Sequence, residues 1–308
     1  MKVESIAAID VGSNAIRLLI NNVEDFEEKK AIKKNAYIRV PVRLGEDVFD
    51  VGRIGGEKIR RLIETMRAFT HLMHVFNVRR YRACATSAMR EAKNGVEVGA
   101  MVRDMAGIQI DIISGAEEAD LIFAAGSLEE IMRGGQNYLH VDVGGGSTEV
   151  VVYCDQRKET AFSFPIGTLR ILAGAVPEAA EAEFKKRLQK IHDQYAPLEI
   201  IASGGNINKT LKLFGKKDGE AVDFASLDQF HRNLSVLSFE ERLERYKMNS
   251  YRADVIVPAL SIFLLIGRVC KVRRFIIPKV GLVDGIIRQL HTGQLEARTA
   301  PDLPNEWS

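Results

Sequence analysis

The sequence predicts an α/β protein built from two duplicated domains, and three observations lead to this prediction. The chain has 308 residues, which fits two domains of about 150 residues each. A strand, a glycine turn and a second strand occur near the N-terminus and return near the middle, over residues 5–23 and 138–153. Both halves then continue with alternating strand and helix patterns, which favour the α/β class.

In the first copy of the repeat, an aspartate ends a strand and a glycine turn follows at once. Asp10 closes the strand of residues 5–10, residues 11–14 form the turn, and residues 16–23 form the second strand. Because the turn is short, the two strands must be antiparallel neighbours in a hairpin.

The second copy has the same order of features. Asp142 closes the strand of residues 138–142, residues 144–148 form the turn, and residues 149–153 form the next strand. This internal repeat indicates a duplicated domain. We place the boundary near Gly126, which gives domains 1–125 and 126–308.

The remaining elements follow from hydrophobic periodicity. Further strands are predicted at residues 37–44, 82–85, 108–113, 199–202 and 274–277. Amphipathic helices are predicted around residues 59–69 and 178–195, and a glycine-rich turn at 203–206 leads into a helix that begins near residue 207. The apolar run 255–267 contains a proline and is shorter than the roughly 18 residues that suggest a membrane span, so it predicts a buried helix.

Composition narrows the class of partner. Hydrophobic residues make up 46% and charged residues 27%, an ordinary globular composition. The net charge of +2 shows none of the basic excess of a nucleic-acid binder. Cys84, Cys154 and Cys270 are too far apart for a metal or disulfide framework, so a reducing cytoplasm is expected. No membrane association is expected, and a homodimer is the default oligomer.

The two glycine turns are the first candidate binding sites. Backbone N–H groups in such a turn can hold phosphate oxygens, and glycine lets the backbone approach them closely. Simple tight turns are the alternative, but two aspartate–glycine hairpins in one chain favour phosphate binding. A dinucleotide fingerprint at 142–148 is excluded, because that motif must open a helix and a strand follows here.

Asp142 and Glu149 flank the second turn and are candidate metal ligands. Carboxylates on neighbouring hairpin strands can hold Mg²⁺ directly or through its waters, with substrate phosphates completing the coordination. The alternative is a pair of solvated acids, but Asp142 follows a buried strand, where an unpaired carboxylate is costly.

Three further segments can be interpreted either as ligand-binding sites or as ordinary helix starts. Thr86, Ser87 and Arg90 follow the strand of residues 82–85, where ligands bind in open α/β sheets, or they cap a helix. The turn at 203–206 presents a helix N-terminus to an anion, and residues 281–285 do so more weakly. Glu117 and Glu118 follow Ser114 and read most simply as first-turn acids of a capped helix. The six histidines show no catalytic pairing.

Taken in order, these segments resemble the exopolyphosphatase and guanosine pentaphosphate phosphohydrolase family. The resemblance rests on residues 9–14, 85–93, 113–118, 142–149, 165–170 and 202–206, and it extends from Ile6 to about Leu290. It implies two ribonuclease-H-like, actin-like domains around a central cleft, the fold of the superfamily of acetate and sugar kinases, heat-shock-70 ATPases and actin.

The resemblance also implies roles for individual residues. The catalytic glutamate falls on Glu118, which replaces its interpretation as a first-turn acid of a capped helix. Arg90 would offset charge in the transition state. The magnesium ligands fall on Asp142 and Glu149, with Mn²⁺ as a possible substitute, and Asp10 is grouped with them. The phosphate contacts that the resemblance implies are Ser13, Asn14, Arg90, Gly145, Gly146, Ser147, Gly204 and Gly205. Further phosphate-binding candidates, not taken from the resemblance, are Thr86, Ser87, Arg170, Asn206 and Lys209.

The implied activity is magnesium-dependent release of terminal orthophosphate from inorganic polyphosphate. Guanosine pentaphosphate is the alternative substrate, and an ATP-dependent phosphotransferase or a nucleotide-sensing module is a more distant alternative. Asp120 stands where many relatives carry arginine, and Asn206 replaces a commoner threonine. Because the chain ends at Ser308 without the helical C-terminal domains of longer relatives, we expect short polyphosphates and release of intermediates between cleavages.

Overall fold

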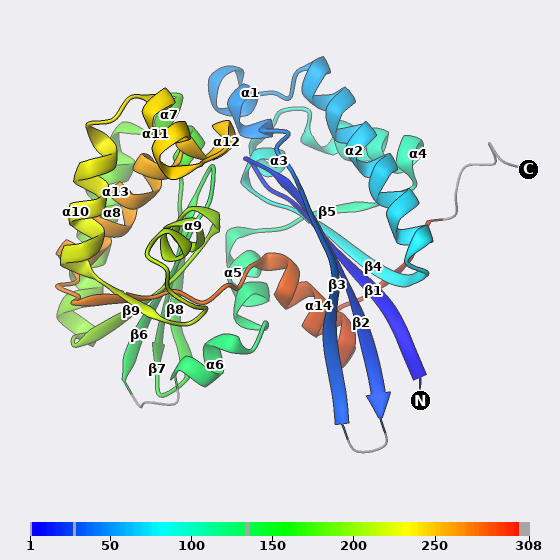
Figure 1. The fold of residues 1–308 in the computed structure, drawn as a ribbon. Coiled ribbons are helices and arrows are strands. Elements are labelled where there is room, and N and C mark those ends of the chain that lie inside the picture. The colour runs from blue at the N-terminus through cyan, green and yellow to red at the C-terminus, as the bar shows by residue number, and fades with distance from the viewer. Residues whose placement is uncertain (1, 27–28, 133–135, 302–308) are drawn as a thin grey trace, which may run out of the picture. The chain divides into compact units, whose positions relative to one another are not determined.

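A computed structural model describes residues 2–26, 29–132 and 136–301, and the chain divides into two compact units (Figure 1). Unit 1 comprises the residues up to Ala125 together with those from Leu282 onward, and unit 2 runs from Gly126 to Gly281. The sequence predicts instead a single domain over residues 126–308. The difference arises because helix α14 (Leu282–Thr292) packs its apolar face on strand β1 and helix α5 of unit 1.

Unit 1 is built on a mixed six-stranded sheet. Strand β1 pairs antiparallel with β2, β2 pairs antiparallel with β3, and β1 pairs parallel with β4, which in turn pairs parallel with β5. A short strand β12 (Arg298–Thr299) adds to β4. The bounds are β1 Lys2–Val11, β2 Ile16–Phe26, β3 Lys29–Val40, β4 Val78–Ala85 and β5 Ile110–Ile112.

Unit 2 repeats this plan. Strand β6 pairs antiparallel with β7, β7 pairs antiparallel with β8, and β6 pairs parallel with β9, which pairs parallel with β11. A further short strand, β10, lies antiparallel on β11. The bounds are β6 Asn137–Val143, β7 Thr148–Cys154, β8 Arg157–Phe164, β9 Leu198–Ser203, β10 Ala221–Asp223 and β11 Arg274–Ile276.

The shared strand order is the structural signature of the duplication. Reading from the third strand of each meander, the order is β3-β2-β1-β4-β5 in unit 1 and β8-β7-β6-β9-β11 in unit 2, with the same strand directions throughout. This is the ribonuclease-H-like arrangement, and it confirms the predicted duplicated α/β fold.

Helices cover these sheets and form the rest of each core. Unit 1 carries α1 (Leu44–Val51), α2 (Gly56–Val75), α3 (Ser87–Glu91), α4 (Gly95–Ala106), α5 (Gly115–Phe123) and α14. Unit 2 carries α6 (Ser127–Ile131), α7 (Thr168–Leu172), α8 (Glu178–Tyr195), α9 (Gly205–Leu213), α10 (Phe224–Ser235), α11 (Phe239–Tyr246), α12 (Ser250–Ala253) and α13 (Ile256–Val269).

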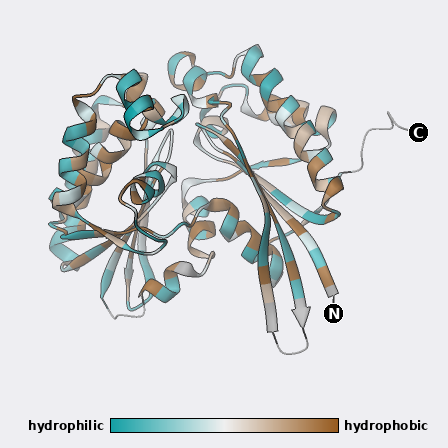
Figure 2. Cartoon of the chain, viewed as in Figure 1, coloured by the Kyte–Doolittle hydropathy of each residue, from teal (hydrophilic) through white to brown (hydrophobic). Residues whose placement is uncertain are grey.

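Two helices show how residue spacing sets their place. In α2, Leu62, Met66, Phe69 and Met73 recur every three or four residues and are buried, and Figure 2 shows hydrophobic and hydrophilic residues interleaved along this helix. Helix α13 is apolar on most sides and lies in the core of unit 2, as predicted. Within the described residues, no helix is both long and apolar enough to cross a membrane.

One predicted strand is wrong at its end. The sequence suggested a strand at residues 37–44, but β3 stops at Val40 and α1 begins at Leu44. Pro41 cannot donate to a strand ladder, and Arg43 takes a left-handed backbone conformation with φ of 59°. The chain therefore turns sharply between the strand and the helix, and this turn lies against the first glycine hairpin.

Candidate active site

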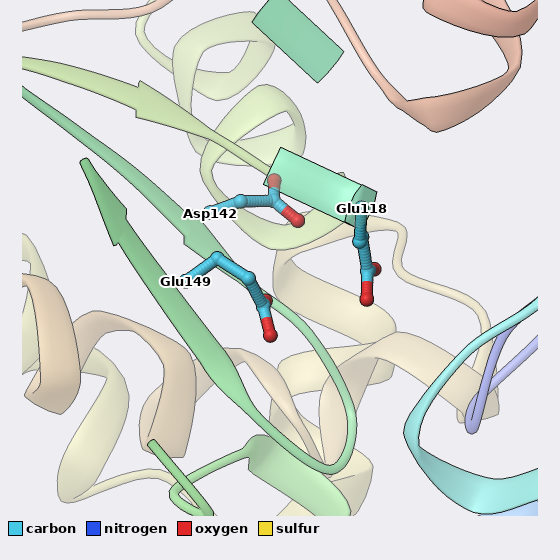
Figure 3. Close-up of side chains that lie close together, drawn as sticks. All are labelled: Glu118, Asp142 and Glu149. Atoms are coloured by element: carbon cyan, nitrogen blue, oxygen red, sulfur yellow. The ribbon is translucent and has the colours of Figure 1, made fainter. Parts of the chain in front are cut away.

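The second glycine hairpin joins two carboxylates on one face of the sheet of unit 2. Asp142 on β6 and Glu149 on β7 are direct cross-strand partners, so their side chains point to the same face. Figure 3 shows the two side chains extending from neighbouring strands, and it also labels Glu118. The turn is closed by a bond of 3.0 Å from the Gly144 N–H to the Ser147 carbonyl.

Serine hydroxyls hold both carboxylates. Ser203, the residue beside Asp142 on β9, donates to Asp142 Oδ1. Glu149 Oε1 accepts from Ser147 Oγ at 2.6 Å and from Ser163 Oγ at 2.9 Å. Ser163 was not predicted, and only the register of β7 on β8 places it opposite Glu149. Each acid is therefore fixed by at least one neighbouring hydroxyl.

The carbonyl side of this turn is covered by the segment that leads into α7. The carbonyls of Gly144, Gly145 and Gly146 accept bonds of 3.1, 2.8 and 2.8 Å from Thr168 N–H, Leu169 N–H and Arg170 Nε. Gly167 makes this approach possible, because a Cβ there would come within 2.5 Å of the Gly146 backbone. Three hydrogen bonds to its carbonyls thus fix the backbone of the turn.

Two N–H groups of the same turn differ from that of Gly144, which donates to the Ser147 carbonyl. Among the described residues, Gly145 and Gly146 N–H form no hydrogen bond. Because neither N–H group donates to another described residue, both can donate to an anion. Arg170, predicted to touch the substrate, is buried at 6% exposure and its Nε supports the turn; contact with the substrate stays a prediction.

The third glycine segment of interest lies between β9 and α9. Gly204 has φ of +114°, and a Cβ at this position would come 2.9 Å from the Val143 carbonyl, so only glycine fits. The helix begins at Gly205, two residues earlier than predicted. Its N-terminus therefore lies directly behind the strand end, as an anion-binding helix start requires.

Arg252 is a basic residue beside this turn that the sequence did not reveal. Its Nη1 donates to Asn206 Oδ1 at 3.2 Å and lies 2.9 Å from where a Cβ on Gly205 would be. The pKa of Lys209 is lowered by burial and then by Lys212 and Arg252. Positive charge therefore gathers at this turn through a residue distant in sequence, which periodicity cannot show.

In unit 1, the first hairpin has the same backbone but different side chains. Gly12 N–H donates to the Ala15 carbonyl at 3.2 Å. Asp10 on β1 lies opposite Arg17 on β2, and the two form an ion pair. Burial raises the pKa of Asp10, while Arg17 opposes this shift. Metal binding by Asp10 stays a prediction, and the ion pair with Arg17 makes Asp10 a weaker candidate ligand than Asp142 or Glu149.

The predicted phosphate-binding serines of unit 1 lie together. Ser13 Oγ and Ser87 Oγ are 2.8 Å apart, because β4 lies parallel to β1 and ends at the same sheet edge. Thr86 N–H donates to the Val11 carbonyl at 3.3 Å, and its side chain forms no cap bond to α3. Thr86 therefore occupies the N-cap position of α3 without a side-chain cap bond, and its phosphate-binding role stays a prediction.

A turn support like that of unit 2 is present here too. The carbonyls of Ser13 and Asn14 accept bonds of 2.9 and 3.2 Å from the N–H groups of Gly45 and Arg43, at the start of α1. In both units, the segment after the third strand therefore binds the carbonyls of the hairpin turn. These two bonds fix the backbone of Ser13 and Asn14 in the turn.

Arg90 and Glu118 belong to neighbouring segments of unit 1. Arg90 Nη1 donates to the Ile113 carbonyl at 2.7 Å, just before α5. Ser114 caps that helix by accepting from Glu117 N–H at 3.1 Å, so the predicted cap is present. Glu117 is exposed, whereas Glu118 is buried at 9% exposure. The second acid is therefore the one held within the protein.

Helix α14 sets the position of α5. A Cβ on Gly285 would come 1.6 Å from the Leu121 carbonyl, so the backbones of the two helices are in direct contact. Gly285 lies inside α14 rather than in a turn. Gly285 therefore has a packing role next to the helix of Glu118, while anion binding by residues 281–285, at the start of α14, stays a prediction.

These features define a class of protein: a duplicated ribonuclease-H-like fold whose second glycine hairpin has an acid pair beside two N–H groups that bond to no other described residue. Comparison with known proteins narrows the class. The model of the Ppx/GppA phosphatase family matches residues 23–292. The chain belongs to the Ppx/GppA phosphatase family, which confirms the predicted family and the prediction of a hydrolase.

Individual relatives agree with this family. The chain is 34% identical over 281 residues to a protein named exopolyphosphatase 2 from Mycobacterium tuberculosis, covering 83% of this chain and 88% of that one. A solved exopolyphosphatase from Cytophaga hutchinsonii has a TM-score of 0.82 at 21% identity, covering 94% and 98% of the two chains. A Ppx/GppA family member from Aquifex aeolicus has a TM-score of 0.74 at 24% identity, covering 96% and 100%. The two structures support the fold.

Proposed function

We propose that the chain is a magnesium-dependent phosphohydrolase that releases terminal orthophosphate from inorganic polyphosphate. The observation that carries the proposal is the second hairpin, where two cross-strand acids adjoin a turn with two available N–H groups. Family membership supplies the phosphatase chemistry, and the exopolyphosphatase names of the relatives support the phosphoanhydride substrate.

The donor set fits magnesium. Mg²⁺ prefers oxygen ligands and usually binds through one or two carboxylates, with waters and substrate phosphates completing an octahedron. Asp142 and Glu149 provide two such carboxylates on one face, each fixed by serine hydroxyls. When bound, the ion would neutralise phosphate charge. Mn²⁺ shares the preference for carboxylate ligands and would serve as a substitute.

The glycine turns hold the terminal phosphate. The N–H groups of Gly145 and Gly146 donate to its oxygens, while the bonds from the α7 segment keep the turn from moving. Donors that are already oriented need no reorganisation during the reaction and stabilise the transition state most. In unit 1, the Ser13 and Ser87 hydroxyls are proposed as further donors.

Glu118 acts as the general base. It accepts a proton from a water whose oxygen attacks the terminal phosphorus; the bond from that phosphorus to the bridging oxygen breaks, and the shortened chain leaves with the bridging oxygen. The Ser114 cap and the contact with Gly285 fix the helix that carries Glu118. Arg90, Lys209 and Arg252 supply positive charge for the phosphates of the substrate.

Guanosine pentaphosphate is the second candidate substrate, because it presents the same terminal phosphoanhydride to these donors. Side-by-side values of kcat/KM for polyphosphate and guanosine pentaphosphate decide between them. A phosphotransferase would release little phosphate without an acceptor, so phosphate release from polyphosphate and magnesium alone separates hydrolysis from transfer.

The direct test of the base is Glu118→Gln, with Glu117→Gln as the matched control on the exposed side of the same helix turn. Loss of a general base lowers turnover by roughly two to four orders of magnitude, while binding of polyphosphate should persist. The control should retain most activity. Equal losses in both variants, or full activity in both, would reject Glu118 as the base.

A further inference from the structure

We propose that His140 and Ser203 form a hydrogen-bonded chain that positions Asp142 for metal binding, with His140 as the outer member. The inference rests on the proposed function, since it assumes that Asp142 is a metal ligand. All three residues lie in unit 2, on the adjacent strands β6 and β9. His140 and Asp142 are two residues apart on β6 and therefore share a face of the sheet.

Two consecutive contacts connect His140 to Asp142 through Ser203. His140 Nε2 lies 3.0 Å from Ser203 Oγ, and Ser203 Oγ donates to Asp142 Oδ1. Ser203 Oγ is also 3.4 Å from the Val141 carbonyl, a longer and weaker contact. His140 is 2% exposed and Ser203 is fully buried, so this chain is closed to solvent at its outer end.

The direction of the chain follows from counting protons. A serine hydroxyl has one hydrogen, and a carboxylate can only accept. If that hydrogen goes to Asp142, the Ser203 oxygen must accept from His140, which then carries its hydrogen on Nε2. Consecutive hydrogen bonds of this kind polarise one another. With its hydrogen on Nε2, His140 donates to Ser203 and does not compete as an acceptor, so the Ser203 hydrogen stays available to Asp142.

The duplicated unit provides an internal comparison. The position of His140, two residues before the aspartate, is Ala8 in unit 1, and the position of Ser203, beside the aspartate on the parallel strand, is Cys84. Unit 1 therefore lacks the chain at the hairpin where Asp10 pairs with Arg17. The polar chain occurs where the aspartate faces a second acid and must be oriented by hydrogen bonds.

A buried histidine could also be kept for packing alone, and the two roles make different predictions. Partners that orient a metal ligand typically change metal affinity by 10–100-fold when they are removed. A packing role changes stability but is independent of Ser203. Coupling between the two side chains therefore distinguishes positioning from packing.

The experiment measures Mn²⁺ binding to the full chain without substrate, by electron paramagnetic resonance. The variants are Ser203→Ala, His140→Leu, His140→Gln and the double variant Ser203→Ala/His140→Leu. His231 Nε2 and Ser261 Oγ, 2.8 Å apart on exposed surface of the same unit, provide the matched control as His231→Leu and Ser261→Ala. Circular dichroism verifies that each variant folds.

We expect Ser203→Ala to weaken Mn²⁺ binding roughly 10–100-fold. His140→Leu should weaken it about threefold to tenfold, the value of one neutral hydrogen bond, and should add nothing in the Ser203→Ala background. His140→Gln, which keeps an N–H donor, should restore most of the affinity even if His140→Leu folds poorly. The control pair should bind as the wild type does.

Asp142→Asn separates failure of this inference from failure of the proposed function. If Asp142→Asn loses Mn²⁺ while Ser203→Ala and both His140 variants bind normally, the positioning chain is wrong and the metal site stands. Additive effects of Ser203→Ala and His140→Leu would also overturn the chain. If Asp142→Asn binds Mn²⁺ as the wild type does, the metal site itself fails.

Discussion

The two glycine hairpins have the same closing backbone hydrogen bond but differ in the residue that lies opposite the aspartate. Asp10 and Asp142 each end the first strand, and in both hairpins the first glycine donates to the carbonyl three residues later. The cross-strand partner of Asp10 is Arg17, whereas the partner of Asp142 is Glu149. The same position is therefore a cation in one unit and an acid in the other.

The duplicated hairpins therefore differ in charge: one holds an ion pair, and the other holds two acids. In unit 1, Arg17 forms an ion pair with Asp10, so this acid has a cationic partner within the protein. In unit 2, two acids stand side by side, and a divalent cation would compensate both. The turns themselves remain alike, since each is supported from its carbonyl side by the segment after the third strand.

The largest effect is expected when the second hairpin receives the side chain of the first. Glu149→Arg should give Asp142 a cationic partner, and hydrolysis should fall by more than about 100-fold, because loss of a ligand exceeds the 10–100-fold effect of losing its supporting partner. Rates measured against magnesium concentration test this. Glu159→Arg, on the exposed surface of β8, is the control, and an unchanged metal response in Glu149→Arg would contradict the account.

His140 should make the stability of the protein depend on pH, whereas Ala8, at the corresponding position of unit 1, has no group that titrates. Burial lowers the pKa of His140 from 6.5 to about 4. Between these values, the unfolded chain binds a proton that the folded chain does not, so this contribution is full above pH 6.5 and is lost as pH falls to 4. The loss amounts to roughly 3 kcal/mol.

Denaturation in urea and a chelator, at several pH values between 7 and 4, checks this prediction. The free energy of unfolding of the wild type should fall relative to that of His140→Gln across this interval, since the variant lacks the imidazole. A difference between the two proteins that stays constant from pH 7 to pH 4 would show that His140 titrates normally.

The support behind the second turn predicts a smaller effect. Gly167→Ala would place a methyl group within 2.5 Å of the Gly146 backbone and push the turn out of place. Because misplaced donors lose transition-state stabilisation, kcat/KM should fall roughly tenfold. Gly56→Ala, whose Cβ would meet nothing within 4 Å, is the control, and equal kinetics in both variants would argue against a rigid turn.

The sequence predicted those features that depend on local pattern. The hairpins, the helix of residues 178–195 and the cross-strand acids follow from alternation and from turn glycines, which act over a few residues. The Ser114 cap is local as well. These predictions needed no knowledge of which strand lies beside which.

Contacts between distant segments could not be predicted in this way. Ser163 reaches Glu149 only through the register of β8, and Arg252 reaches Asn206 across 46 residues of sequence. The burial of Arg170 and the return of residues from Leu282 onward to unit 1 depend on tertiary packing. The His140–Ser203 contact joins two strands whose neighbourhood is a property of the sheet order.

The most direct test of the difference between the hairpins is a Mn²⁺ titration of Asp142→Asn and Asp10→Asn beside the wild type, by calorimetry without substrate. We predict that Asp142→Asn weakens binding by more than about tenfold, whereas Asp10→Asn leaves the affinity within about threefold of the wild type, because Arg17 already compensates that acid. Equal losses in the two variants, or a loss confined to Asp10→Asn, would contradict the assignment of the metal site to the second hairpin.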